Sequence, residues 1–352
     1  MSKTRRHILP FFIPHLGCPN QCIFCDQKKI AGCVQPPTGD DLTAVLQNLP
    51  PGAEDKPELA FYGGSFTAIP TRQQLEYLQP AAKALQEGRI SDIRLSTRPD
   101  AIDEPRLSLL RQFGVDTVEL GVQSMTDGVL KAARRGHTAE DSLRAVRLLK
   151  KWGFVAGVQL MPGLPGETAA SALLGAERIL AEKPAMLRIY PTVVLKGTEC
   201  EALYQSGSYQ PLSLAEAVEI SLQIKLLAED LRVQVIRIGL QPTEELAAQV
   251  LAGPYHESFG ALVQAFYWRQ KLLFALRKLP LATECYLNRR DIAAAVGYQR
   301  QNLAYYPPRL RLRGREMAAG SLLLKAADGQ EFCLSDTEFA AVYLARCRKN
   351  WR

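Results

Sequence analysis

Three cysteines stand close together near the start of the chain, in residues 17–26 (GCPNQCIFCD). Cys18, Cys22 and Cys25 follow the spacing Cys-x3-Cys-x2-Cys, and thiolates are ligands that favour soft metals. The usual iron–sulfur cubane is held by four cysteines, and a zinc ribbon needs a second pair further along the chain. The simplest interpretation is a [4Fe–4S] cluster with one iron open to a small molecule. A disulfide and a partial zinc site are the alternatives, and the cytosolic composition disfavours the disulfide.

The five remaining cysteines are scattered along the chain. Cys33 lies eight residues after Cys25 and could supply a fourth ligand, but the Pro and Gly residues around it favour an ordinary loop. We predict that all five serve as small packing residues: Cys33, Cys200, Cys285, Cys333 and Cys347.

Strand-like and helix-like segments alternate through residues 8–238. Strands are predicted at residues 8–13, 58–62, 93–97, 115–121, 154–160, 186–190 and 233–238. Helices are predicted at residues 38–48, 71–86, 104–113, 138–152, 168–181 and 213–230. Three of these helices open with a capping box, at Thr38, Thr138 and Ser213. At least six strand–helix repeats predict an α/β fold with a parallel sheet.

Glycines and polar residues gather just after the predicted strands. Residues 63–67 (GGSFT) follow the second strand, and residues 122–124 (VQS) follow the fourth. In a parallel barrel or an open parallel sheet, such loops converge on one face and form the site. Paired glycines allow the backbone to approach a ligand closely, although a plain tight turn would also use them. No Gly-x-Gly-x-x-Gly follows any strand, so the dinucleotide-binding fingerprint is missing.

The cysteine segment and these strand ends together resemble the radical S-adenosylmethionine (radical SAM) enzymes. Phe24 stands just before the last cysteine, as an aromatic residue does in the cluster loop of that superfamily. Further similar segments are residues 63–67 (GGSFT), 96–100 (STRPD), 119–124 (ELGVQS), 135–138 (RGHT), 161–165 (MPGLP) and 188–192 (RIYPT). They resemble in particular the radical SAM domain of the Elongator catalytic subunit and, more distantly, the oxygen-independent coproporphyrinogen oxidases. The resemblance covers roughly residues 7–205 and implies a partial (β/α)6-type, TIM-like barrel.

The resemblance implies two cofactors, a [4Fe–4S] cluster and S-adenosylmethionine (SAM). In that superfamily the reduced cluster cleaves SAM to a 5′-deoxyadenosyl radical, which abstracts a hydrogen atom from substrate. The electron comes from a donor such as flavodoxin or ferredoxin. By resemblance Cys18, Cys22 and Cys25 would hold the cluster, and the residues around SAM would be Phe24, Gly63, Gly64, Ser65, Ser96, Gln123, Arg135 and Gln159.

Several of these residues have structural alternatives. Gln123 and Gln159 could be ordinary caps at strand ends, and Arg135 could pair with a surface carboxylate. Ser96 departs from the coproporphyrinogen oxidases, which often carry Glu at this place. His137 could touch substrate, or it could be a hydrogen-bonded structural histidine.

Two departures separate the chain from the Elongator subunit. That subunit spaces its first two cluster cysteines more widely, and an acetyltransferase domain follows its radical SAM domain. Here about a hundred residues follow the predicted barrel, and they contain no Arg/Gln-x-x-Gly-x-Gly/Ala loop for acetyl-CoA. Acetyl transfer is therefore not expected.

Positive charge is concentrated towards the C-terminal end. Residues 261–352 carry 16 Lys and Arg against 7 Asp and Glu, a net charge of +9, whereas the whole chain carries +7. We divide the chain into a core domain, residues 1–245, and a small basic α+β domain, residues 246–352, that binds substrate or covers the barrel. A helix is predicted at residues 258–278. The sequence then reads Tyr305-Tyr306 and Arg309-x-Arg311-x-Arg313-x-Arg315.

Alternate arginines on a strand point to one side. Beside tyrosines they form a surface suited to the backbone and bases of RNA. A solvated basic surface without a partner is the alternative.

Three functions stay open. The first is an enzyme that modifies RNA, foremost transfer RNA (tRNA), by radical chemistry. The second is a radical SAM oxidoreductase that acts on a small molecule such as a tetrapyrrole, and the third is a protein that binds the cluster or SAM without turnover. No run of about 18 apolar residues occurs, so no membrane span is expected and a cytoplasmic location is predicted.

Overall fold

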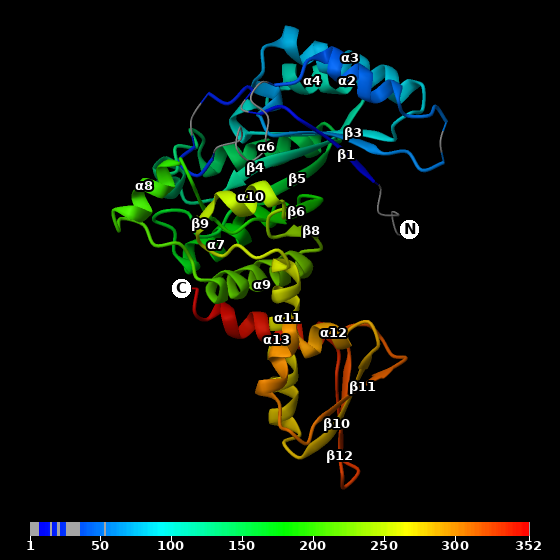
Figure 1. Cartoon of the computed structure of the whole chain (residues 1–352), viewed down its shortest axis with the longest axis vertical. Coiled ribbons are helices and arrows are strands. Elements are labelled where there is room, and N and C mark those ends of the chain that lie inside the picture. Colours follow the sequence, from blue (N-terminus) through cyan, green and yellow to red (C-terminus); the bar gives the residue numbers. More distant parts are fainter. Residues whose placement is uncertain (1–6, 15, 20–21, 26–35, 53, 352) are drawn as a thin grey trace.

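The computed structural model describes residues 7–14, 16–19, 22–25, 36–52 and 54–351. Within these residues seven strands form one parallel sheet, here called the large sheet, in the order β1-β2-β3-β4-β5-β6-β8. The strands are β1 (Ile8–Phe12), β2 (Glu58–Tyr62), β3 (Asp92–Thr97), β4 (Val115–Gln123), β5 (Val155–Leu160), β6 (Met186–Ile189) and β8 (Gln234–Ile238). The large sheet curls into a half-barrel (Figure 1), so the predicted α/β fold with a partial parallel barrel is confirmed.

The crossover helices begin close to the predicted positions because their caps are local. They are α2 (Gly39–Gln47), α3 (Thr71–Gln86), α4 (Glu104–Gln112), α6 (Ala139–Lys151), α7 (Ala169–Leu180) and α9 (Leu214–Asp230). The Thr38 side chain accepts a hydrogen bond from the Asp41 amide, and the Asp41 carboxylate accepts one from the Thr38 amide. Thr138 and Ser213 head the same reciprocal caps. Each cap satisfies two amide groups at the helix start.

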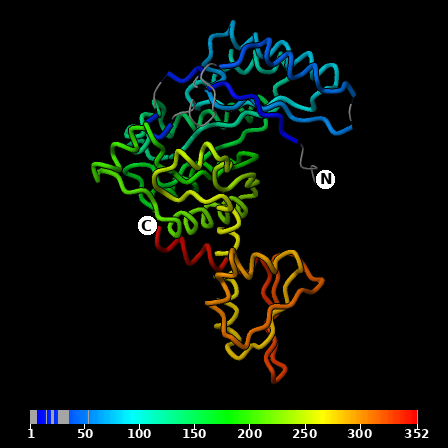
Figure 2. The backbone as a smooth tube through the Cα atoms, in the orientation of Figure 1, coloured from blue at the N-terminus to red at the C-terminus, as the bar shows by residue number. Residues whose placement is uncertain are grey.

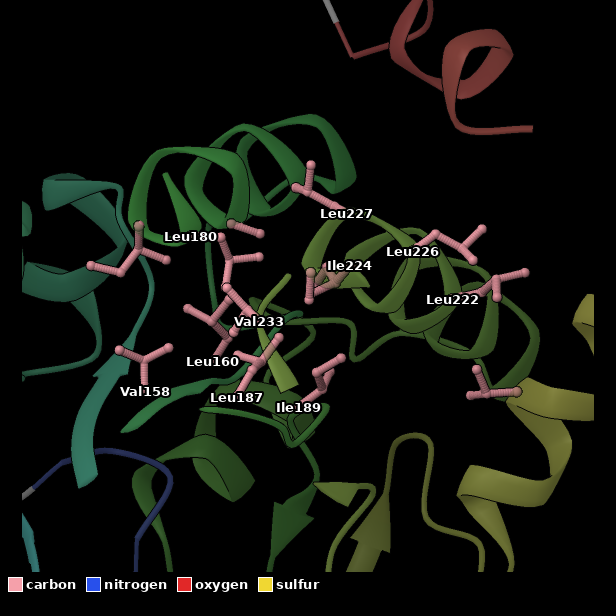
Figure 3. Packing of buried hydrophobic residues seen from close by; sticks show 14 of the residues in the cluster. Val158, Leu160, Leu180, Leu187, Ile189, Leu222, Ile224, Leu226, Leu227 and Val233 are labelled. Carbon is pink, nitrogen blue, oxygen red and sulfur yellow. The ribbon is translucent and has the colours of Figure 1, made fainter. Parts of the chain in front are cut away.

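The large sheet has two unlike faces. The strand residues that point towards α7 and α9 are apolar and buried: Val158, Leu160, Leu187 and Ile189 (Figure 3). Between them in the sequence stand Gln159 and Arg188, which project from the opposite, concave face because side chains alternate along a strand. A parallel strand buried on both faces is normally apolar throughout. The polar residues Gln159 and Arg188 therefore distinguish the concave face from the apolar face that packs on α7 and α9.

Short elements surround the carboxyl ends of the strands. They are η1 (Phe66–Ala68), η2 (Pro99–Ala101), α5 (Asp127–Ala132), β7 (Val194–Leu195), α8 (Glu199–Gln205), α10 (Glu244–Gln249) and β9 (Val250–Ala252). β7 pairs with β9 in antiparallel fashion. This pair joins the segment that follows β6 to the segment that follows β8.

A second sheet, here called the C-terminal sheet, lies at one end of the long axis of the molecule (Figure 1). Among the described residues its order is β11-β10-β12-β13. Its strands and the elements that connect them are β10 (Ala282–Asn288), α12 (Ile292–Val296), η3 (Tyr298–Tyr305), β11 (Arg311–Arg315), β12 (Leu322–Ala326) and β13 (Glu331–Leu334). α11 (Phe259–Lys278) leads to this sheet, and α13 (Asp336–Arg348) returns from it to α9 (Figure 2). The division between residues 245 and 246 stays a prediction.

α11 is the helix predicted at residues 258–278. More of it is buried than one apolar face would require, Trp268 and Lys271 included, because it packs against α9 as well as against elements of the C-terminal sheet. The Lys271 ammonium pairs with the carboxylate of Asp336 at 2.9 Å, and the Tyr267 hydroxyl donates to the same carboxylate at 2.6 Å. Neither α11 nor any other helix of the described residues is long and apolar enough to cross a membrane.

Candidate active site

The cysteine segment is locked against the loop that follows β2. The Ser65 amide donates to the Leu16 carbonyl at 2.9 Å. A Cβ atom on Gly64 would lie 2.3 Å from the Leu16 carbonyl oxygen, and one on Gly17 would lie 2.3 Å from the Ser65 carbonyl oxygen. Gly63 has a φ of +101°, which favours glycine. The structure thus uses Gly64 and Gly17 for close backbone packing of the cysteine segment, and the contact of Gly63 and Gly64 with a ligand stays a prediction.

Two cysteines meet polar side chains, one from the loop that follows β2 and one from the segment that follows α5. The Cys18 sulfur lies 3.5 Å from the Ser65 hydroxyl. The Arg135 guanidinium donates to the Cys22 sulfur at 3.1 Å and to the Gly121 carbonyl of β4 at 2.7 Å. Hydrogen bonds to sulfur ligands are one of the means by which a protein tunes an iron–sulfur cluster. Arg135 therefore contacts Cys22, one of the three predicted cluster ligands. The sequence analysis did not predict a contact between Arg135 and a cysteine.

Phe24 and Ile23 anchor the cysteine segment in an apolar cluster. Both side chains are buried, beside Val129, Leu164 and Tyr209. The backbone of Ile23 accepts a hydrogen bond from the Cys200 amide at 2.9 Å. Burial of this kind fixes the segment between Cys22 and Cys25 against the rest of the chain. The contact of Phe24 with an adenine ring stays a prediction.

The donor set fits an iron–sulfur cluster. Cys18, Cys22 and Cys25 are all described residues, and none of them is in a disulfide. Among the described residues, no three His, Cys, Asp or Glu side chains are gathered closely enough to hold a single metal ion. A four-iron cluster requires a wider arrangement, because each thiolate binds a different iron. Cys33, considered as a fourth ligand, lies outside the described residues.

Gln123 and Gln159 lie together at the carboxyl ends of β4 and β5. The side-chain amide nitrogen of Gln159 donates to the side-chain oxygen of Gln123 at 3.2 Å. Gln123 has a φ of +68°, and the register between β4 and β5 shifts at this place. Such a backbone is uncommon for a residue other than glycine and is found where a side chain must be aimed in a particular direction. The structure thus brings the two predicted glutamines together.

Glu167 joins the same two strand ends and was missed by the sequence analysis. Its carboxylate accepts hydrogen bonds from the Ser124 hydroxyl at 2.6 Å and from the Gly163 amide at 2.9 Å. Burial raises the pKa of this carboxyl above its usual value. Glu167 therefore holds the loop after β4 against the loop after β5. A single Glu between two turns carries no pattern in the sequence that would have revealed it.

Ser96 and His137 have structural partners. The Ser96 hydroxyl donates to the Phe61 carbonyl at 3.4 Å, on the concave face. A ring nitrogen of His137 lies 3.2 Å from the Val122 carbonyl, and the ring is buried. Burial lowers the pKa of His137 to about 4. Of the two predicted roles for His137, the geometry favours the hydrogen-bonded structural histidine.

A charge cluster fills the concave face behind the strand ends. Glu119 of β4 accepts a hydrogen bond from Arg94 of β3 at 2.8 Å and from Arg188 of β6 at 2.5 Å. Arg94 also pairs with Glu58 of β2 at 2.9 Å. The Tyr62 hydroxyl donates to Glu119 at 3.2 Å and accepts from Arg188 at 3.0 Å. Four strands are thereby joined by side chains, and the sequence analysis did not predict this network because its members are far apart in the sequence.

The members of the charge cluster compensate one another. Burial opposes ionisation of Glu119, but hydrogen bonds and positive charge from Arg188 and Arg94 outweigh it and keep the pKa of the carboxyl below its usual value. Burial, with the charge of Glu119, raises the pKa of the Tyr62 hydroxyl. Two arginines face two carboxylates, so the cluster is neutral as a whole. Because each charge in this network has a partner, the cluster can form the base of a site without presenting an unpaired charge to a ligand.

Three of the scattered cysteines behave as predicted. Cys200, Cys285 and Cys347 are buried, and burial raises the pKa of the Cys200 and Cys285 thiols to about 12. The prediction is wrong for Cys333, which is exposed on β13. Its strand alternates between a buried and a solvated face, and Cys333 falls on the solvated one.

Two family models match the chain. The radical SAM superfamily matches residues 12–173, and the Radical_SAM C-terminal domain matches residues 184–268. The first match spans the predicted cysteines, glycines and glutamines, and the second ends within α11. The chain belongs to the radical SAM superfamily, as the resemblance predicts, and it is an enzyme of that class. The C-terminal sheet lies beyond both matches.

Individual relatives match a smaller part of the chain. The tRNA uridine(34) acetyltransferase of Methanocaldococcus infernus is 31% identical over 186 residues, which cover 47% of this chain and 35% of that protein. Elongator complex protein 3 of Homo sapiens is 29% identical over 201 residues, which cover 49% of this chain and 35% of that protein. The solved structure of the archaeal Methanocaldococcus infernus Elp3 with an N-terminus deletion matches with a TM-score of 0.59 and 25% identity, over 76% of this chain and 64% of that one. The chain spans about a third of the length of these curated relatives.

Proposed function

We propose that the protein binds a [4Fe–4S] cluster through Cys18, Cys22 and Cys25, binds and reductively cleaves SAM, and modifies tRNA. One observation carries the proposal. The cysteine segment meets Ser65 and Arg135 where the parallel strands end, which is where barrels and half-barrels of this kind hold their ligands.

The remaining site residues have proposed roles toward SAM. Ser65 and the glycine pair would meet the methionyl end, and Phe24 would lie near the adenine. Ser96, Gln123, Arg135 and Gln159 would line the ribose and carboxylate side. When bound, the cluster and SAM supply a 5′-deoxyadenosyl radical that abstracts a hydrogen atom from substrate. The chain's own part is to orient these groups and to exclude water.

Water exclusion has a structural basis on two sides of the site. The apolar cluster around Phe24 covers the cysteine segment. The charge cluster of Glu119, Arg94 and Arg188 fills the concave face behind the strand ends. We propose that cofactor and substrate bind at the carboxyl ends of the strands, between these two clusters. A reactive radical needs such a closed, dry surrounding.

RNA as the substrate rests on the relatives and on charge. The relatives named as tRNA uridine(34) acetyltransferases match 47% of this chain, and residues 261–352 carry a net charge of +9. We propose that residues 1–245 form the catalytic core and that residues 246–352 contribute to substrate binding. The reaction would use an electron donor such as flavodoxin or ferredoxin in the reducing cytoplasm, where thiolate ligands persist.

The test is 5′-deoxyadenosine formation by the anaerobically reconstituted protein with SAM and dithionite, with and without bulk tRNA. Cys22→Ala removes a ligand and should abolish both the cluster absorbance and SAM cleavage. Cys333→Ala is the matched control, because Cys333 is exposed on the C-terminal sheet, away from the site. This variant should keep the cluster and the SAM cleavage that the unaltered protein shows without RNA.

The outcomes separate the alternatives. Strong stimulation of SAM cleavage by tRNA supports the proposal and directs the search to the modified base. Slow cleavage that RNA does not change would move the substrate to a small molecule, the tetrapyrrole alternative included. A protein with a full cluster that cleaves no SAM at all would contradict the proposal.

A further inference from the structure

We infer that the solvated face of the C-terminal sheet binds a single-stranded segment of RNA, with Tyr286 as a stacking platform and the arginines of β11 as phosphate contacts. The inference rests on the proposed function for the identity of the polymer. It concerns residues 282–334, which neither family match includes.

Because side chains alternate along each strand, the C-terminal sheet has a packed face and a solvated face. Leu312, Cys285 and Leu324 stand opposite one another in register on β11, β10 and β12, and Cys285 and Leu324 are fully buried. Residues one position away along each strand point to the other side. The sheet is thus amphipathic, and its second face meets solvent.

The solvated face is ordered in two rows across the strands. One row consists of Arg313, Tyr286, Leu323 and Cys333. The next consists of Arg311, Glu284, Lys325 and Glu331. Arg315 stands opposite Asn288 at the end of the same face. The three arginines of β11 are exposed, whereas the charges of β12 and β13 are joined in the Lys325–Glu331 pair.

The positive charge of the face therefore lies along one strand. Arg311, Arg313 and Arg315 are two residues apart, which places their Cα atoms about 6.6 Å from one another along β11. This spacing is close to that of phosphates along an extended single strand. A guanidinium offers five N–H donors in a planar fork that suits phosphate. Arg313 donates to Glu284 through Nε at 2.7 Å, which leaves its terminal nitrogens available.

Tyr286 supplies an aromatic surface at the centre of the face. Its hydroxyl donates to Glu284 at 2.6 Å, and this bond fixes the ring beside β11. The Arg315 guanidinium and the Lys325 ammonium both lie 5.9 Å from the ring centroid. A ring between cations is suited to a base that stacks on it while its phosphates meet the basic side chains.

The position of the sheet favours a long polymer over a small anion. The C-terminal sheet lies at the far end of the long axis from the helices that cover β1 to β3 (Figure 1). A substrate that reaches both this sheet and the strand ends of the half-barrel must be large. A tRNA has the required length as well as single-stranded loops, whereas a small metabolite has neither.

The test measures binding of a fluorescent single-stranded RNA of about ten nucleotides, a length that one such surface can hold, to the full chain over a range of salt concentrations. Arg311→Gln with Arg313→Gln should reduce affinity and lower the slope of log K against log salt by about 0.7 per lost phosphate contact. Tyr286→Leu should weaken binding about tenfold and leave the slope unchanged. Lys83→Gln with Lys151→Gln, exposed lysines on α3 and α6, is the charge-matched control.

Each outcome decides for or against the inference. Selective loss in the β11 and Tyr286 variants, with the control unaffected, supports it. Equal loss in the control, or equally tight binding of heparin with no effect of Tyr286→Leu, would overturn it in favour of non-specific attraction. SAM cleavage without RNA is measured in parallel on every variant. If RNA binds as inferred but the unaltered protein cleaves no SAM, the proposed function fails and the inference about the face stands.

Discussion

The half-barrel and the C-terminal sheet each contain an Arg–Glu–Tyr trio, and the two trios differ in burial. In the half-barrel, Arg188 and Tyr62 both bond Glu119, and the Arg188 and Glu119 side chains are 14% and 7% exposed. In the C-terminal sheet, Arg313 and Tyr286 both bond Glu284, and the Arg313 and Glu284 side chains are 48% and 29% exposed.

The difference in burial changes what the same chemistry does. A buried ion pair gives up its hydration, so each partner depends on the others and none is available to a ligand. An exposed ion pair contributes little to stability, and its donors can be shared with a new partner. We therefore expect changes in the buried trio to alter the stability of the fold, and changes in the exposed trio to alter the binding of a partner.

The largest effect is expected from Glu119→Gln. This change leaves the buried Arg94 and Arg188 guanidinium groups with insufficient negative charge and should lower the free energy of unfolding by about 4 kcal/mol. The measurement is urea-induced unfolding followed by circular dichroism. Glu284→Gln makes the same chemical change in the exposed trio and should not move the urea midpoint. Equal destabilisation by the two variants would show that burial does not distinguish the trios.

A smaller, pH-dependent effect is expected at His137, another buried polar group of the half-barrel. Its pKa is lowered from 6.5 to about 4, so the unfolded chain takes up a proton that the folded chain does not. The free energy of unfolding should therefore fall as the pH is lowered from 6.5 to about 4, by up to about 3 kcal/mol from this group. The loss should be complete below that window and absent above it.

The variant His137→Asn tests this expectation. Its unfolding free energy is compared with that of the unaltered chain at pH 7.5 and at several lower values. The difference between the two proteins should shrink by the stated amount as the pH falls, because carboxylates that titrate in the same range are common to both. A constant difference across the range would contradict the assignment of His137 as a neutral, buried ring.

The smallest effect is expected from Glu284→Gln in RNA binding. This change removes a negative charge from the solvated face and releases Arg313, so affinity for single-stranded RNA should rise about threefold at moderate salt. The measurement is the same fluorescence titration as for the β11 variants. Unchanged or weaker binding would mean that the exposed trio does not contact the polymer.

Local features of the fold could be predicted from the sequence. The caps at Thr38, Thr138 and Ser213 each depend on four consecutive residues, and the strands depend on short apolar runs. Both patterns can therefore be recognised from a short stretch of sequence. The motifs around the cysteines and strand ends were likewise contiguous. Of the predicted residues, Ser65 lies beside Cys18, Arg135 donates to Cys22, and Gln159 donates to Gln123.

Contacts that depend on the register of distant strands could not be predicted. Arg94, Glu119 and Arg188 are separated by 25 and 69 residues, and only the curvature and pairing of the large sheet bring them together. Glu167 lies in a turn, and its partners come from two loops. The close backbone packing at Gly17 and Gly64 could not be predicted either. A glycine in the sequence allows a close approach but does not identify the group that approaches.

The attachment of the C-terminal sheet has a geometric consequence. α11 packs against α9 on the way out, and α13 packs against α9 on the way back. After α13, the indole N–H of Trp351 donates to the side-chain oxygen of Gln223 in α9 at 2.8 Å. The two helices that connect the C-terminal sheet to the half-barrel are therefore both fastened to α9. If RNA binds on the outer face of this sheet as inferred, α11 and α13 set the distance between the bound segment and the strand ends of the half-barrel.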